Sequence, residues 1–154
     1  MDRHESLDYW LALTQISGLG ALSVFRAWRF LGTPKALFEA PVEALQSVGI
    51  KPKAARALSG FKDWHEVVRL RRQIADLGAE ILALDDARYP ESLARIADPP
   101  PVLFAKGRLE TLQSAAIAVV GARQASDLGR HFAYRLGNQL ANRGLCVVLS
   151  LIHI

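Results

Sequence analysis

The sequence has 154 residues, of which 51% are hydrophobic and 22% charged, a balance typical of a folded globular protein that excludes a disordered chain. The length allows one medium domain or two small ones, and a formal net charge of +4 permits an anionic partner without requiring one. Cys146 is the single cysteine, which excludes an intramolecular disulfide.

No apolar run approaches the roughly 18 residues of a membrane span, and the N-terminus lacks the apolar core of a signal peptide. We therefore expect a cytoplasmic protein with no membrane partner.

Residues 1–77 predict a small domain built only of helices. Apolar side chains recur at helical spacing from Leu7 to Leu31, from Val42 to Leu58 and from Trp64 to Leu77. Thr33 stands where it can cap the helix that follows Gly32.

Two glycine-containing turns, at 16–20 and 45–50, each join two of these helices. A pair of helix–hairpin–helix units can hold a DNA phosphate on backbone N–H groups, because glycine lets the backbone approach closely. Neither turn carries a Lys or Arg within it, and Lys51 and Lys53 flank only the second. Plain tight turns in a small helical bundle are therefore the favoured interpretation.

The pattern changes near Gly78, so residues 78–154 predict a second, mixed α/β domain. Strands are expected at 80–84, 102–105, 115–120 and 145–149, and helices at 91–96 and 127–143. The last strand, helix and strand predict a βαβ unit with two parallel strands. The strand at 115–120 has no polar residue, as expected for one buried on both faces, and Cys146 is expected to be buried in the next strand.

The residues with the clearest chemistry are Gly121-Ala122-Arg123, between that buried strand and the following helix. Ligands of open α/β sheets bind beyond the carboxyl ends of strands, and a helix N-terminus attracts anions. Gly121 and Ala122 leave space for a phosphate, and Arg123 adds a planar set of donors. Ser126 is either the N-cap of the helix or a direct phosphate donor.

This turn is neither the dinucleotide fingerprint G-x-G-x-x-G nor a P-loop, because Arg123 follows where a second glycine belongs and no Gly-Lys-Ser/Thr is present. A plain sheet-to-helix turn with a solvated arginine is the alternative. The four histidines are scattered, and Asp85-Asp86 is expected to be a solvated turn. We therefore assign no catalytic residue, no metal ligand and no cofactor.

The second half contains a series of short motifs: Tyr89-Pro90, Asp98-Pro99-Pro100-Pro101, Lys106-Gly107, Val120-Gly121-Ala122-Arg123 and Gly129. These motifs give it a resemblance to the DNA-processing protein DprA (Smf) family. The resemblance implies an extended Rossmann-like domain, preceded by a small helical (helix–hairpin–helix or SAM-like) domain, that binds and protects single-stranded DNA in natural transformation. It also implies loading of the RecA recombinase and a homodimer in the full-length parent.

The resemblance places the phosphate contact on Arg123, framed by Gly121 and Ala122. Lys106 is either a further contact or a residue with a core or surface role. After Val148 the family continues into a second glycine-rich turn, whereas this sequence reads Leu149-Ser150-Leu151-Ile152-His153-Ile154. We therefore expect a chain truncated at its C-terminus that lacks half of the sheet and pocket, in which His153 is not a site residue.

Two other functions stay open. A Rossmann-type enzyme acting on a nucleotide could use the same turn, but it would need a catalytic carboxylate or a second glycine-rich loop. A helix–hairpin–helix scaffold, in which only the N-terminal helices fold, is the other.

Overall fold

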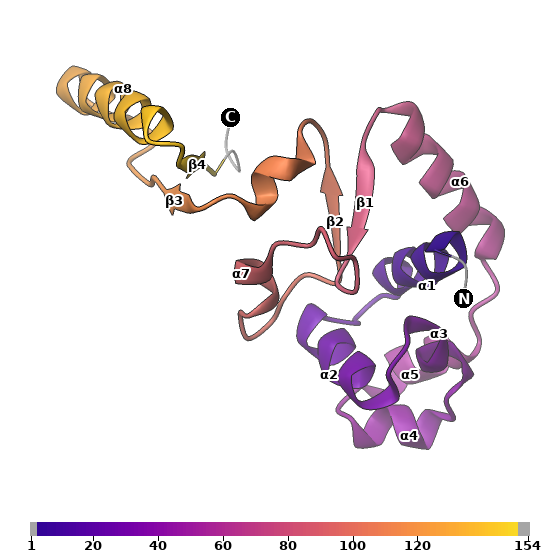
Figure 1. Cartoon of the computed structure of the whole chain (residues 1–154). Helices are drawn as coiled ribbons and strands as arrows, with labels where there is room; N and C mark the ends of the chain where they lie inside the picture. The colour runs from indigo at the N-terminus through magenta and orange to yellow at the C-terminus, as the bar shows by residue number, and fades with distance from the viewer. Residues whose placement is uncertain (1–2, 151–154) are drawn as a thin grey trace. The chain divides into compact units, whose positions relative to one another are not determined.

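A computed structural model describes residues 3–150 of the chain (Figure 1). Residues 1, 2 and 151–154, which include His153 and most of the apolar tail, lie outside the described residues. The chain forms two compact units, Met1–Leu109 and Glu110–Ile154, each with its own internal contacts. None of the described helices is both long and apolar enough to span a membrane.

The first unit begins with helices alone, as expected from the apolar spacing. They are α1 (Arg3–Gln15), α2 (Ala21–Leu31), α3 (Pro34–Glu39), α4 (Val42–Ser47), α5 (Pro52–Ser59) and α6 (Trp64–Asp76). The hydroxyl of Thr33 accepts a hydrogen bond from the Ala36 N–H over 3.2 Å, so the predicted cap of α3 is confirmed.

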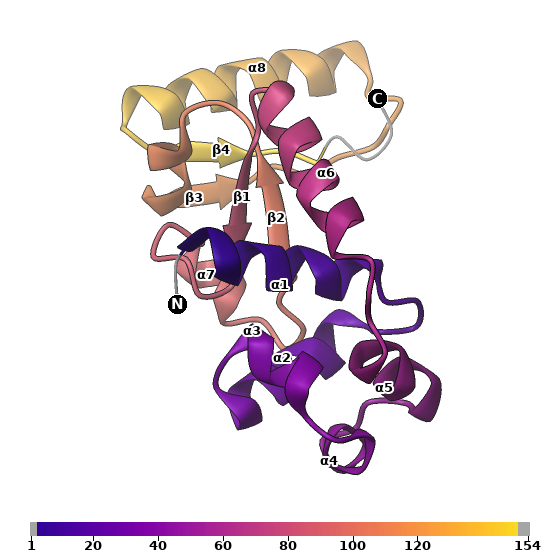
Figure 2. The ribbon, with the colours of Figure 1, turned by 90° about the vertical axis from the view of Figure 1, so that its right-hand side faces the viewer.

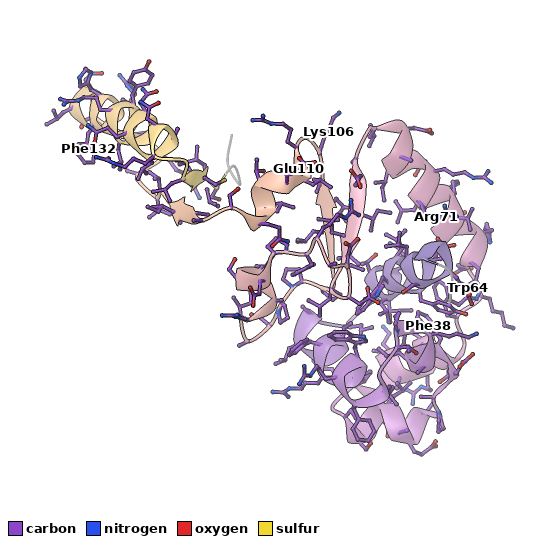
Figure 3. All side chains as sticks on the ribbon, in the orientation of Figure 1. Phe38, Trp64, Arg71, Lys106, Glu110 and Phe132 are labelled. Carbon is purple, nitrogen blue, oxygen red and sulfur yellow. The ribbon has the colours of Figure 1, made fainter. Side chains whose placement is uncertain are left out.

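The core of this unit is made by the apolar stripes of the helices. Trp10, Leu37, Leu45 and Leu58 are completely or almost completely buried. An aromatic cluster packs beside α1. The ring of Trp64 contacts those of Tyr9, Phe38 and Phe61, with ring centroids 4.9–5.2 Å apart (Figure 3). These contacts join α1, α3 and α6, which are far apart in the sequence.

Two strands complete the first unit: β1 (Glu80–Ala83) and β2 (Val102–Ala105), with the short helix α7 (Glu91–Ala94) between them. The strands are antiparallel, with Glu80 opposite Ala105. Helices α1 and α6 lie on the same side of this pair (Figure 2) and contact it. The change from helices alone to mixed structure thus falls near Gly78. The two compact units, by contrast, divide at Leu109. Separate domains at 1–77 and 78–154 stay a prediction.

The second unit contains the 3₁₀ helix η1 (Leu109–Gln113), which begins at the junction, followed by β3 (Ala116–Ala118), α8 (Asp127–Asn142) and β4 (Cys146–Val148). β3 and β4 are parallel, with Ala116 opposite Cys146. The strand–helix–strand prediction, with parallel strands, is therefore confirmed.

The α/β class is also confirmed, but a Rossmann-like sheet is not. The strands of residues 3–150 form two separate two-stranded sheets, β1–β2 and β3–β4. The expectation that the strand at 115–120 is buried on both faces was wrong, because all three residues of β3 are exposed. Burial of both faces needs layers on both sides of a wider sheet, whereas β3 pairs with β4 alone among the described strands. Cys146 is half-buried for the same reason.

Candidate phosphate-binding site

The candidate site lies in the second unit, in the segment between the end of β3 and the start of α8. The Val119 N–H donates to the Val148 carbonyl over 3.0 Å, so pairing with the β4 segment continues up to the turn. Gly121, Ala122 and Arg123 follow directly and are all exposed. A Cβ placed on Gly121 would meet no atom within 4 Å, so the backbone here is open to a ligand.

Arg123 is the cation of this turn. Within residues 3–150 its guanidinium makes no ion pair and no side-chain hydrogen bond. A guanidinium offers five N–H donors in one plane, a geometry that matches two oxygens of a phosphate. The side chain can therefore bind an anion without first breaking a contact inside the protein.

Ser126 is the N-cap of α8. Its Oγ accepts a hydrogen bond from the Gly129 N–H over 3.2 Å. A Cβ on Gly129 would come within 3.3 Å of the same Oγ, so glycine leaves room for this cap. Of the two roles expected for Ser126, the cap is the one that the structure contains; its hydroxyl hydrogen can still be donated to a ligand.

The first turn of α8 carries one ion pair, between Asp127 and Arg130. Asp127 places a negative charge at the positive end of the helix, which is favourable for the helix but opposes a bound anion. Because Arg130 balances this charge, the unpaired positive charge near the turn is that of Arg123.

Lys106, the remaining predicted contact, belongs to the first unit (Figure 3). It follows β2, and its Nζ donates to the carbonyl oxygen of Leu77 over 2.8 Å. Leu77 is the C-cap of α6, so the ammonium occupies the negative end of that helix. The structure therefore gives Lys106 an intramolecular role that the sequence did not predict.

A second polar cluster surrounds Arg88, in the loop after β1. Its guanidinium contacts both carboxylate oxygens of Asp86, at 3.1 and 2.9 Å, and Glu80 at 2.6 Å. These hydrogen bonds, first to Asp86 and then to Glu80, raise the pKa of Arg88 above its usual value. Asp85 is exposed, as expected, but the expectation of a solvated Asp86 was wrong, because only 10% of its side chain is accessible.

The Asp86–Arg88 cluster borders a cavity of about 440 Å³ lined also by Ser6, Leu7 and Asp85. The sequence signals this Asp86–Arg88 cluster only by the Asp-x-Arg spacing, which is too common in exposed turns to predict it. In the described part of the chain, no three His, Cys, Asp or Glu side chains come close enough together to hold a metal ion.

Comparison with known proteins shows which family these features are similar to. Residues 80–151 match the family described as DNA recombination-mediator protein A. Over these residues the chain is similar to the DprA/Smf family. The matched segment contains Gly121, Ala122, Arg123 and Ser126, so the whole candidate site lies in the part that carries the family's pattern. Lys106 of the first unit also lies in the matched segment.

Two relatives extend the similarity over the first unit. Protein Smf of Synechocystis sp. is 27% identical over 148 residues, which are 93% of this chain and 37% of the relative. DNA processing protein DprA of Bacillus subtilis is 27% identical over 144 residues, 92% of this chain and 48% of the relative. The chain thus spans between a third and a half of the length of these curated relatives.

Proposed function

We propose that the chain binds single-stranded DNA through the turn Gly121-Ala122-Arg123, as part of a recombination mediator of the DprA/Smf type. The observation that carries the proposal is Arg123, an exposed guanidinium with no partner within residues 3–150, next to an open glycine backbone and ahead of a helix. A backbone phosphate is the ligand that best matches this combination of fixed donors and unpaired charge.

Arg123 also argues against a dinucleotide at this turn. A pyrophosphate that presses against the backbone needs glycine where Arg123 stands, whereas a DNA phosphate can be held at the distance of a side chain. The site is proposed to bind and not to catalyse, because a phosphate contact of this kind supplies position and charge without a nucleophile or a general base.

The remaining properties are those that similarity to the family suggests, and they are proposals for the whole protein. They are protection of incoming DNA in natural transformation, loading of RecA, a homodimer, a cytoplasmic location and a complete Rossmann-like sheet. The similarity of the chain to DNA recombination-mediator protein A supports them.

A titration of 5′-labelled oligo-dT with the chain tests the DNA contact directly. Arg123→Ala is expected to weaken binding and to lower the magnitude of the slope of log K against log salt by about 0.7, the value for one lost contact with a single strand. Arg143→Ala is the matched control, because Arg143 is exposed and caps the opposite end of α8.

Equal binding of Arg123→Ala and the parent chain, at low and at moderate salt, would remove Arg123 from the site. Displacement of oligo-dT by millimolar AMP would favour a mononucleotide pocket, and with it a Rossmann-type enzyme, over a DNA surface.

A further inference from the structure

The stretch between Glu43 and Asp63 has an unusual charge pattern. It contains four basic residues and no acidic one, across the end of α4, the second glycine turn and all of α5. The basic residues are Lys51, Lys53, Arg56 and Lys62.

Three of these charges form a surface on α5, which we call the α5 basic surface: Lys51, Lys53 and Arg56. All three side chains are exposed, while Ala54, Ala55 and Leu58 bury the other face of the helix. Lys53 and Arg56 are three residues apart and so lie on the same face, and Lys51 is the N-cap residue at its start. The surface is thus a row of cations beside a buried apolar face.

The α5 basic surface is not neutralised within the described part of the chain, where none of its three residues forms an ion pair or a side-chain hydrogen bond. Several other basic residues of the first unit do form ion pairs. Lys35 pairs with Glu5 and Glu39, Arg71 with Asp8, and Arg95 with Glu91. Intramolecular ion pairing therefore does not explain the charges on α5.

The turn before α5 does not need these charges for its own geometry. Gly49 has φ +91°, and the Ile50 N–H donates to the Leu45 carbonyl over 3.1 Å, which closes the turn. The first glycine turn has the same left-handed glycine, Gly18 with φ +80°. The positions that correspond to Lys51 and Lys53, two and four residues after that glycine, hold Gly20 and Leu22. The same kind of hairpin is thus built without charge.

We propose that the α5 basic surface is a second DNA contact, separate from the Arg123 turn, which binds the phosphate backbone and does not read bases. Three adjacent unpaired cations fit the regular spacing of charge on a polyanion. The aromatic ring nearest in the sequence, Phe61, is half-buried against Phe38 and Trp64, so this ring is not free to stack on bases. A contact with phosphates alone works with single strands and with duplexes.

The test uses the full chain and two 5′-labelled probes of equal length, oligo-dT and a duplex of mixed sequence. The variant Lys51→Gln, Lys53→Gln, Arg56→Gln removes the three charges from exposed positions. The control variant Arg69→Gln, Arg72→Gln, Arg95→Gln removes the same charge from exposed positions of α6 and of the C-cap of α7. Circular dichroism checks that both variants keep the helical content of the parent.

We expect the α5 variant to lose at least about tenfold in affinity for both probes at low salt, and the control to stay within about twofold of the parent. The slope of log K against log salt falls in magnitude by about 2 for oligo-dT and slightly more for the duplex, since each lost phosphate contact accounts for about 0.7 or 0.9. Duplex binding persists in Arg123→Ala, which separates this surface from the site in the second unit.

Three results would overturn the proposal: no duplex binding by the parent chain, no change in either slope for the α5 variant, or an equal loss in the control variant. None of these bears on oligo-dT binding by Arg123, so failure of this surface and failure of the Arg123 site are told apart.

Discussion

The Nζ of Lys106 donates a hydrogen bond to the carbonyl oxygen of Leu77 over 2.8 Å, across 29 positions of the sequence. Through this bond the residue that follows β2 holds the last turn of α6, whose carbonyls have no partner within the helix. Removal of the charge should therefore loosen the junction between α6 and β2.

Lys106→Met keeps the aliphatic side chain and removes the donor, so we expect a loss of about 0.5 kcal/mol in the free energy of unfolding, small because the bond is exposed. Urea unfolding followed by tryptophan fluorescence measures it, since Trp10, Trp28 and Trp64 all lie in the first unit. Lys62→Met, at an exposed lysine, is the control. A stability equal to that of the parent, together with weaker DNA binding, would instead favour a DNA contact for Lys106.

The ion pair between Arg71 and Asp8 joins α6 to α1 with Nε and Oδ1 2.7 Å apart. Both side chains are less than one third exposed, so removal of one partner leaves a partly buried charge. Asp8→Asn should lower the free energy of unfolding by about 1–2 kcal/mol, whereas Arg69→Ala, which breaks the exposed pair with Glu66, should change it by less than about 0.5 kcal/mol. Similar losses in both variants would show that the Asp8–Arg71 pair stabilises the protein no more than an exposed ion pair does.

Tyr89 is 5% exposed, and its hydroxyl donates to the carbonyl oxygen of Pro100 over 2.8 Å, which ties the Tyr-Pro segment to the proline connector. Tyr89→Phe leaves that carbonyl without this donor and is expected to cost about 1 kcal/mol. Urea unfolding at pH 7 measures the difference, with the exposed Tyr134→Phe in the second unit as control. An unchanged unfolding midpoint would mean that the hydrogen bond contributes nothing net.

Burial also raises the pKa of Tyr89 above its usual value near 10. Between the unfolded and the folded pKa the folded chain binds more protons, so the contribution of Tyr89 to stability is complete below pH 10 and is lost as the pH rises through the folded pKa. The free energy of unfolding should therefore fall more steeply above pH 10 in the parent than in Tyr89→Phe. Parallel pH profiles for the two proteins would contradict this.

Two variants of Ser126 distinguish its role as the N-cap of α8 from a contact with DNA. Ser126→Ala removes the N-cap and should destabilise α8 by about 1 kcal/mol, seen as faster amide hydrogen exchange in the first turns of the helix. Ser126→Asn keeps a capping oxygen and should restore slow exchange. If Ser126→Asn nevertheless binds oligo-dT much more weakly than the parent, the hydroxyl contacts the phosphate as well.

The sequence by itself determined the local structure: the all-helical character of the N-terminal part, the cap at Thr33, the parallel pair β3–β4 and the open turn at Arg123. Each depends on residues a few positions apart, through apolar spacing, capping side chains and the absence of bulk at glycine. The candidate site could be located in the same way, because Gly121, Ala122, Arg123 and Ser126 are contiguous.

Only the tertiary structure decided which of these residues have partners inside the protein. Arg71 meets Asp8 across 63 positions and Lys106 meets Leu77 across 29, while the side chains of Arg123 and of the α5 basic surface have no ion pair or hydrogen bond within residues 3–150. It also decided that β3 is exposed, which the apolar run 115–120 did not predict. The physical reason is the same in each case: periodicity and caps act along the chain, whereas pairing and burial depend on which distant surfaces pack together.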